Sequence, residues 1–329
     1  MQWRPRSRLA VLAIVAPAIA VTAATVPAGS AAAAQASPAA SHVQASPAAS
    51  HAETSAAASP ADVPGPPSGW STVFSDDFNG SSGSGVDSQW MYDTGAGSSF
   101  GTGEIETMTN STSNVYLDGN GNLDITALED GSGNWTSGRL QTTSANVGAP
   151  AGGELEVTAS IQQPSGGDGY WPAFWMLGPG QWPENGEVDI MEDVNSLSEV
   201  SGTVHCGTDP GGPCNEPTGV GSGLVSCGGC QGGYNTYTMV LDRTNTSDES
   251  ISFYLNGAQY YSVSESQVGA STWQAAFDHN MSIMLDLAMG GAYPDGVCNC
   301  TTPDGTTTSG GTMSVAYVAA YTTNGSTAG

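Results

Sequence analysis

The feature that most constrains this chain is a succession of short β-type runs separated by turn residues, with almost no helical periodicity. Runs such as 153–163, 169–178 and 234–242 are rich in β-branched and aromatic residues and are bounded by Gly, Asn or Asp. The dipeptide Asn256-Gly257 is a strong hairpin signal. Many short strands at regular spacing predict an all-β sandwich or jelly roll. A short helix or loop excursion is expected at 265–277.

The chain divides into three segments by composition. Residues 1–34 are predicted to be a secretory signal peptide, because an arginine-containing start precedes an apolar run and an alanine-rich stretch. Ala and Pro dilute that apolar run, which is too short for a membrane anchor. Residues 35–68 contain the octamer QASPAASH twice and are predicted to be a disordered linker. Residues 69–323 keep a uniform composition and are predicted to form one domain.

The charge balance excludes several classes of partner. The 329 residues contain five Lys and Arg against 31 Asp and Glu, and there is no Lys. Without the signal segment only Arg139 and Arg243 remain as cations. Such a protein is not expected to bind nucleic acid or anionic membranes by electrostatics. It should also be repelled by polyanionic polysaccharides, which favours a neutral polymer as partner.

The six cysteines lie in Gly-rich loop sequence and suggest disulfides in an exported protein. Their pairing cannot be deduced from the sequence alone. A zinc site is the alternative for the last four of them. The cysteines are Cys206, Cys214, Cys227, Cys230, Cys298 and Cys300.

The acidic segment "GEVDIMED" is the strongest candidate for a functional site. Its Glu187 and Asp189 alternate with Val188 and Ile190, which is the pattern of a strand, and both acids therefore share one face. The next acid, Glu192, is out of phase. A β-bulge adds one residue and changes the phase of everything after it. If Met191 is that extra residue, all three carboxylates lie on the same face.

The simplest alternative is a solvated acidic strand without a role. Two observations count against it: like charges are adjacent with no Lys to neutralise them, and the preceding run supplies Trp171 and Trp175. Indole rings beside carboxylates suit a sugar-binding site. Two carboxylates that flank a glycosidic bond suffice for hydrolysis, and retaining enzymes place them about 5–5.5 Å apart. The spacing along the strand does not by itself show that separation.

At this point the chain resembles glycoside hydrolase family 16. "GEVDIMED" is similar to the signature of that family. The inserted residue Met191 matches the pattern of the family's laminarinase-like, endo-β-1,3-glucanase branch. Across about residues 70 to 322, further segments match the family's blocks in order: "TSGRLQT", "GYWPAFWMLG", "GTVHCG" and "LDLAMGGAYPDG". The resemblance implies a concanavalin A-like β-jelly-roll of two packed antiparallel sheets, with an open concave cleft for substrate. It also implies endo-acting, retaining hydrolysis of β-1,3- or β-1,4-linked glucans or galactans. With the signal-like start of the chain, we expect a secreted protein that acts as a monomer and needs no cofactor.

The resemblance also implies roles for individual residues. Glu187 matches the nucleophile, Glu192 the general acid/base, and Asp189 the residue that orients the nucleophile. The candidate substrate-binding residues that it suggests are Trp171, Trp175, Trp182, Arg139 and His205, with Asn114 and Glu104 as weaker candidates for outer subsites. Core packing is the alternative for the aromatic residues, and a structural ion pair is the alternative for Arg139. Phe174 is expected in the core, and Arg243 is expected to be structural.

Two positions depart from the family. Asp286 stands where the family usually has Asn, and no role is carried over to it. Ala316 stands where the family usually has an Asp that helps to bind a structural calcium, so a calcium ion at that place is doubtful. Other functions stay open: a β-galactanase or another hydrolase or transglycosylase of the same family, or a non-catalytic carbohydrate-binding module.

Overall fold

The computed structural model describes residues 62–323. The predicted signal peptide and most of the predicted linker lie outside the described residues. The last residues assigned to the linker are part of the fold: Val63 packs against Tyr317 and Tyr321, and the Tyr321 hydroxyl donates a hydrogen bond to the Pro64 carbonyl. The folded unit therefore begins some residues before the predicted boundary at residue 69.

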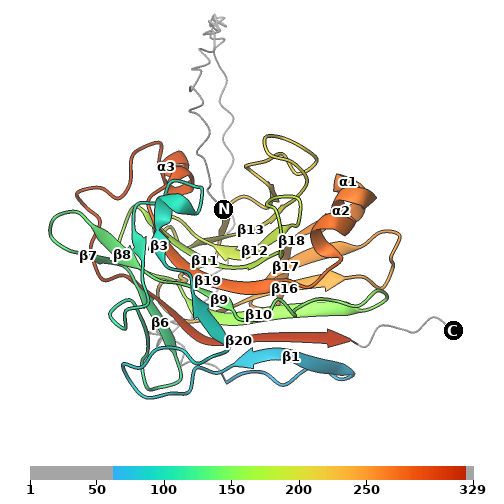
Figure 1. Cartoon of the computed structure of the whole chain (residues 1–329), viewed down its shortest axis with the longest axis horizontal. Coiled ribbons are helices and arrows are strands. Elements are labelled where there is room, and N and C mark those ends of the chain that lie inside the picture. Colours follow the sequence, from blue (N-terminus) through green and yellow to red (C-terminus); the bar gives the residue numbers. More distant parts are fainter. Residues whose placement is uncertain (1–61, 324–329) are drawn as a thin grey trace, which may run out of the picture. The chain divides into compact units, whose positions relative to one another are not determined.

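Two large antiparallel sheets face each other, as predicted (Figure 1). In the first, the order is β18 (Ala258–Ser264), β17 (Ser250–Leu255), β16 (Asn235–Asp242), β10 (Glu154–Gln162), β20 (Thr312–Thr323), β6 (Leu123–Thr126) and β5 (Val115–Leu117), with β1 (Trp70–Asp76) beside β20. In the second, it is β14 (Val220–Gly221), β13 (Glu199–His205), β12 (Glu187–Glu192), β11 (Tyr170–Leu177), β19 (Ser282–Met289), β9 (Arg139–Thr142) and β2 (Trp90–Tyr92), with β15 (Val225–Ser226) beside β13.

The core lies between the inner faces of the two sheets. Strand alternation explains it, because every second side chain points inward. Phe174 of β11 is fully buried there, as predicted, together with Val188 of β12 and Met239 of β16. The Asn256-Gly257 turn joins β17 to β18 with positive φ at both residues, 50° and 78°, as the hairpin signal requires.

Smaller elements cover one end of the second sheet. A four-stranded sheet contains β3 (Gly95–Ala96), β4 (Thr107–Met108), β8 (Trp135–Ser137) and β7 (Leu128–Glu129), and a 3-10 turn, η1 (Gly97–Ser99), follows β3. The helix α3 (Ala292–Cys298), which the sequence analysis did not predict, lies near them (Figure 1). The predicted excursion at 265–277 forms α1 (Glu265–Val268) and α2 (Ala270–Phe277).

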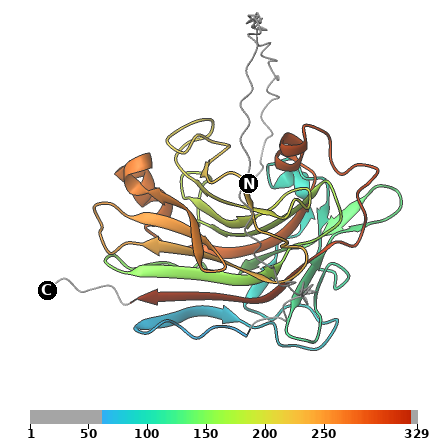
Figure 2. The same ribbon diagram turned by 180° about the vertical axis from the view of Figure 1, so that it is seen from behind.

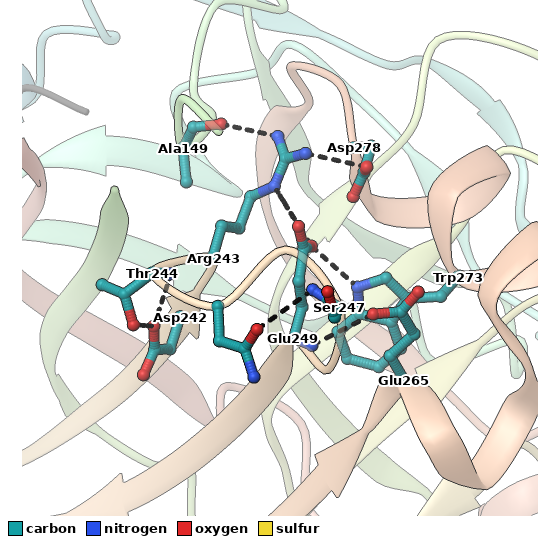
Figure 3. Close-up of polar contacts among 10 residues, drawn as sticks. Ala149, Asp242, Arg243, Thr244, Ser247, Glu249, Glu265, Trp273 and Asp278 are labelled. Carbon is teal, nitrogen blue, oxygen red and sulfur yellow. Dashed lines mark hydrogen bonds and ion pairs between the residues drawn. The ribbon is translucent and has the colours of Figure 1, made fainter. Parts of the chain in front are cut away.

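Arg243 is structural, as expected, and connects α2 to the end of β16 (Figure 3). Its guanidinium donates to both carboxylate oxygens of Glu249 at 3.0 and 3.1 Å, and it forms an ion pair with Asp278 at 2.7 Å. Glu249 also accepts a hydrogen bond from the Trp273 indole of α2 at 3.0 Å. Glu249 is buried and Asp278 is partly exposed, so the single cation chiefly offsets the buried charge of Glu249.

The cysteines pair close to one another along the chain. All six lie in described residues and form three disulfides, so the zinc alternative is wrong. The pairs are Cys206–Cys214, Cys227–Cys230 and Cys298–Cys300. Among residues 62–323 there is no helix long and apolar enough to cross a membrane.

Candidate active site

A β-bulge in β12 brings the three carboxylates to one face, as predicted. Against β11, Asp189 pairs with Trp175 and Met191 pairs with Phe174, which leaves Ile190 without a partner. Ile190 and Met191 are both buried in the core, so two consecutive side chains point inward. The unpaired residue of the register is thus Ile190 and not Met191, because the bulge begins one position earlier than the sequence analysis placed it. The bulge still turns Glu192 to the face that carries Glu187 and Asp189, as expected.

The outer face of the second sheet forms the floor of a cleft of about 440 Å³. Loops rise at two sides of this floor: the segment that contains η1 stands on one side and the loop between β13 and β14 on the other (Figures 1 and 2). The lining includes most of the residues predicted from the sequence. It consists of Phe100, Gly101, Thr102, Glu104, Arg139, Trp171, Ala173, Trp175, Leu177, Trp182, Glu187, Asp189, Glu192, Asp209, Pro217, Asp286 and Ala288.

Burial perturbs both glutamates of β12. For Glu192, burial and then the negative charge of Asp189 raise the pKa to about 8, while the hydrogen bond from Trp171 opposes the shift. For Glu187, burial and then Asp189 raise the pKa well above its ordinary value, and the His205 charge opposes the shift. Two carboxyls in one cleft thus have different neighbours, which is how acids acquire separate roles.

Two indoles of β11 hold carboxylates of the cleft. The Trp171 Nε1 donates to Glu192 Oε1 at 2.8 Å, and the Trp175 Nε1 donates to Asp286 Oδ1 at 2.6 Å. Burial raises the pKa of Asp286 to about 6, with Arg139 and Trp175 opposing that shift. The acid at position 286, for which the sequence suggested no role, therefore belongs to the cleft and fixes one of its tryptophans.

Arg139 lies on the floor of the cleft and contacts rings as well as an acid. Its Cζ is 4.3 Å from the centre of the Phe100 ring and 4.8 Å from that of Trp175. Its Nε is 3.4 Å from Asp93 Oδ2. Cation–π contacts of this kind hold a guanidinium in place without neutralising it. From the sequence, Arg139 was expected either to bind substrate in the cleft or to form a structural ion pair. In the structure it lines the cleft and also pairs with Asp93.

His205 lies beside the acidic strand although it is not part of the cleft lining. Its Nε2 is 3.2 Å from Asp189 Oδ2 and 3.9 Å from Glu187 Oε1. The Trp182 ring, which lines the cleft, lies with its centre 5.8 Å from that of the imidazole. His205 therefore lies beside the nucleophile candidate, and Trp182 lies beside His205.

Asn114 is not placed in the cleft, and its assignment as a substrate-binding residue is corrected. The side chain is buried and its amide nitrogen donates to the Thr126 carbonyl at 3.0 Å and to the Thr136 hydroxyl at 3.1 Å. Its amide oxygen accepts from Thr109 at 2.8 Å. With these bonds the amide is used in joining neighbouring strands and has no free group for a sugar.

Two buried glutamates next to the cleft were missed. Glu216, in the loop between β13 and β14, contacts His205 Nδ1 at 2.7 Å. Glu106 accepts a hydrogen bond from the Met289 amide at 2.8 Å, and burial raises its pKa to about 7. Neither lies in a regular strand, so no alternation of polar and apolar residues marks it. A Cβ added at Gly97 would come within 2.4 Å of Glu106 Oε1, so the η1 segment needs glycine there.

The acidic cluster is compact enough to raise the question of a metal. Ligand atoms of Glu187, Asp189 and His205 lie within 4.8 Å of one another. Both nitrogens of His205 face carboxylates, however, and a doubly protonated imidazole has no lone pair for a metal. We therefore interpret the cluster as a charge network. At the family's calcium position, the methyl group of the buried Ala316 supplies no ligand; the prediction about calcium stays a prediction.

Comparisons with known proteins identify similar catalytic domains. Residues 151–275 match a family model described as "XgeA-like, catalytic GH16 domain". The chain is 47% identical to the crystal structure of an endo-1,3-β-glucanase from Streptomyces sioyaensis, with a TM-score of 0.76, covering 80% of this chain and 100% of that one.

Two curated relatives are similar over most of the domain. A β-glucanase of Rhodothermus marinus is 30% identical over 243 residues, which are 68% of this chain and 77% of the relative. The glucan endo-1,3-β-glucosidase A1 of Niallia circulans is 30% identical over 280 residues, which are 77% of this chain but 38% of that longer protein.

Proposed function

The chain belongs to glycoside hydrolase family 16, and from that premise we propose that it is a secreted, endo-acting, retaining hydrolase of a neutral β-glucan. We propose β-1,3-glucan of the laminarin type as the main substrate, because similar proteins are named for that linkage. Secretion is proposed from the signal-like residues 1–34, and the protein is proposed to act as a monomer without a cofactor.

The observation that carries the proposal is the pair Glu187 and Glu192, which line one cleft from one strand. The first has a histidine at 3.9 Å and the second an indole N–H at 2.8 Å. Burial and Asp189 raise the pKa of Glu187, and the His205 charge opposes that shift and so favours the ionised form, which a nucleophile needs. Burial raises the pKa of Glu192 to about 8. This carboxyl therefore holds a proton near neutral pH, as a general acid must.

In the first step, Glu192 donates its proton to the glycosidic oxygen while a carboxylate oxygen of Glu187 attacks the anomeric carbon. The bond to the leaving sugar breaks, and a covalent glycosyl ester forms on Glu187. In the second step Glu192, now ionised, takes a proton from water, and this water displaces Glu187 from the anomeric carbon. Asp189 orients the nucleophile. Two displacements at one carbon retain its configuration.

The cleft walls suit a neutral sugar chain. Trp171 and Trp182 are partly exposed in the cleft and offer apolar ring faces on which sugar rings can stack. Trp175 also lines the cleft, but it is buried and Arg139 lies over its ring. The carboxylates around them accept hydrogen bonds from hydroxyl groups and repel anionic sugars. We therefore propose that acidic polysaccharides are excluded, that Trp171, Trp182 and Arg139 bind the glucan, and that Trp175 supports Arg139 from below.

The test is a panel of laminarin, lichenan, galactan, agarose and xyloglucan with product analysis. Oligosaccharides of many lengths from laminarin are expected at early times. The newly formed reducing ends should have the β configuration by proton NMR. Oligosaccharides released from a galactan alone would overturn the glucan proposal, and no release from any polymer would favour a binding module. Products longer than the starting oligosaccharide would indicate a transglycosylase.

The residue roles need variants. Glu187→Gln and Glu192→Gln are each expected to abolish cleavage while the protein stays folded, and the exposed Glu184→Gln serves as the matched control. With Glu192→Ala, azide should restore cleavage of an activated aryl glycoside and give a β-glycosyl azide, because azide needs no general base. Near-normal hydrolysis of laminarin by either Gln variant would refute that residue's role.

A further inference from the structure

Glu216 is a buried carboxylate that the proposed mechanism does not use. It belongs to the loop 206–219, which joins β13 to β14, and its side chain is fully shielded from solvent. One oxygen, Oε2, lies 2.7 Å from His205 Nδ1. The other, Oε1, accepts a hydrogen bond from the Cys206 amide at 2.8 Å. Both oxygens of the carboxylate are thus used, and neither faces the cleft.

His205 lies between this carboxylate and the acidic strand. Its Nδ1 faces Glu216, while its Nε2 faces Asp189 at 3.2 Å and Glu187 at 3.9 Å. A neutral imidazole has one N–H and one acceptor nitrogen, so only the doubly protonated ring suits carboxylates on both sides. The charged groups that face it are Glu216 from the loop and Asp189, Glu187 and Glu192 from β12. Burial alone would lower the pKa of His205, but Asp189, Glu216 and Glu187 raise it to about 11.

The loop fixes Glu216 from several directions. Its backbone exchanges hydrogen bonds with Gly211 at 2.6 and 2.7 Å, and a disulfide between Cys206 and Cys214 closes the same loop. The chain then passes directly over the imidazole: a Cβ added at Gly219, which has φ +74°, would come within 2.8 Å of His205 Cε1. A carboxylate held in this way has little freedom to move away from the ring.

We propose that Glu216 is a positioning residue that holds His205 as a fixed imidazolium beside the nucleophile Glu187. The inference rests on the proposed function and deepens it. The positive ring faces Asp189 and Glu187 and favours the ionised state of the attacking carboxylate. Glu216 acts only through His205, because it does not line the cleft.

The first experiment needs no variant. NMR of the protein with labelled histidine follows the imidazole signals from pH 5 to pH 9, and loss of one signal in His205→Gln assigns the residue. The His205 signals are expected to stay those of an imidazolium across this range, whereas a solvated histidine titrates near pH 6.5. Titration of His205 within the range would overturn the proposal. Because no substrate is involved, this result does not depend on the proposed function.

The second experiment is Glu216→Gln. An amide cannot supply two acceptors, so the His205 pKa is expected to fall by about one to three units. We expect kcat on laminarin to fall about tenfold or more with KM changed little, because the charge-assisted hydrogen bond between Glu216 and His205 is weakened and the ring no longer stays a fixed cation beside Glu187. Because the ring then loses its proton nearer to pH 8, activity should fall more steeply on the alkaline side, where Glu192 also loses its proton. Glu265→Gln is the matched control: Glu265 is buried and also accepts a backbone hydrogen bond, but it should change stability only.

A double-mutant cycle decides whether Glu216 acts through the ring. In the His205→Gln background, Glu216→Gln should cause no further loss of kcat. An equal loss in both backgrounds, or a Glu216→Gln variant with the wild-type pH profile and His205 pKa, would overturn the proposal. If Glu216→Gln does not fold, Glu216→Asp keeps the charge, and the wild-type NMR titration still decides. A wild-type protein that cleaves no glucan would refute the proposed function. The NMR titration would then still test whether Glu216 keeps His205 protonated.

Discussion

Replacing Trp171 by Phe should extend activity to higher pH even as it weakens the enzyme. The indole Nε1 donates to Glu192 Oε1 at 2.8 Å, and this bond stabilises the ionised carboxylate. Glu192 must be protonated to act as the acid, and its pKa of about 8 sets the alkaline limb. Removing a donor to the charged form raises that pKa, so the limb moves upward.

The magnitude follows from the strength of the bond. A hydrogen bond to a charged group contributes about 1.5–3 kcal/mol, and one pKa unit corresponds to about 1.36 kcal/mol. The full effect would be one to two units. Trp171 is only partly buried, and water replaces some of the lost interaction, so we expect a shift of about one unit. The Phe ring keeps a stacking surface but a smaller one, so KM should rise.

The assay is kcat/KM against pH on a soluble β-1,3-glucan oligosaccharide, which reports the ionisations of the free enzyme. Thermal melts at each pH separate loss of activity from unfolding. Trp175→Phe is the control, since that indole donates to Asp286 and not to Glu192; its alkaline limb should stay or move slightly down. An unmoved or lowered limb in Trp171→Phe would refute the assignment of that limb to Glu192.

Three further predictions concern charge and cross-links. Arg243→Met should cost about 3–5 kcal/mol of stability at pH 7.5, because it leaves the buried Glu249 without its cation, and lower Tm by about 10 °C. Burial raises the pKa of Asp278 to about 6, so its proton stabilises the fold at low pH and is lost as pH rises through 6. At pH 4.5 Asp278 is neutral and needs the arginine less, so the cost of Arg243→Met measured by chemical denaturation should be smaller. An equal cost at both pH values would contradict this. Asp286→Asn removes a negative neighbour of the acid/base carboxyl, so the alkaline limb of kcat/KM should move down, and an upward shift would be inconsistent with the site. Replacing Cys206 and Cys214 by Ser should cost ~2.5 kcal/mol for an eight-residue separation, measured by urea unfolding; no loss would mean that the loop is equally restricted without the bond.

The acidic strand was the part of the site that the sequence could predict. Alternation in a strand has period two, so an acid out of phase is visible without any structure, and a bulge is the simplest remedy. The position of the bulge was less certain, because the register is set by β11 and β13 as well. The two residues Ile190 and Met191 are both apolar, and either could be the extra one on local grounds.

Residues outside strands were harder to predict. Asn114 was assigned by resemblance, but its role depends on which backbone groups surround it in three dimensions. Glu216 comes eleven residues after His205 in a Gly- and Pro-rich loop, where no periodicity marks a side chain as buried. The boundary at residue 69 followed composition, whereas Val63 is held by contacts with β20 that composition does not show.

The burial of the side chains of Arg139 and Arg243 has a practical consequence. Trypsin cleaves only after Lys and Arg, and in the described residues its targets are Arg139, within β9, and Arg243, at the end of β16, with side chains 12% and 9% exposed. Neither bond can enter a protease active site while the sheets are intact. Digestion of this domain by trypsin therefore requires that it open, and the rate of cleavage becomes a direct gauge of how often the native sandwich comes apart.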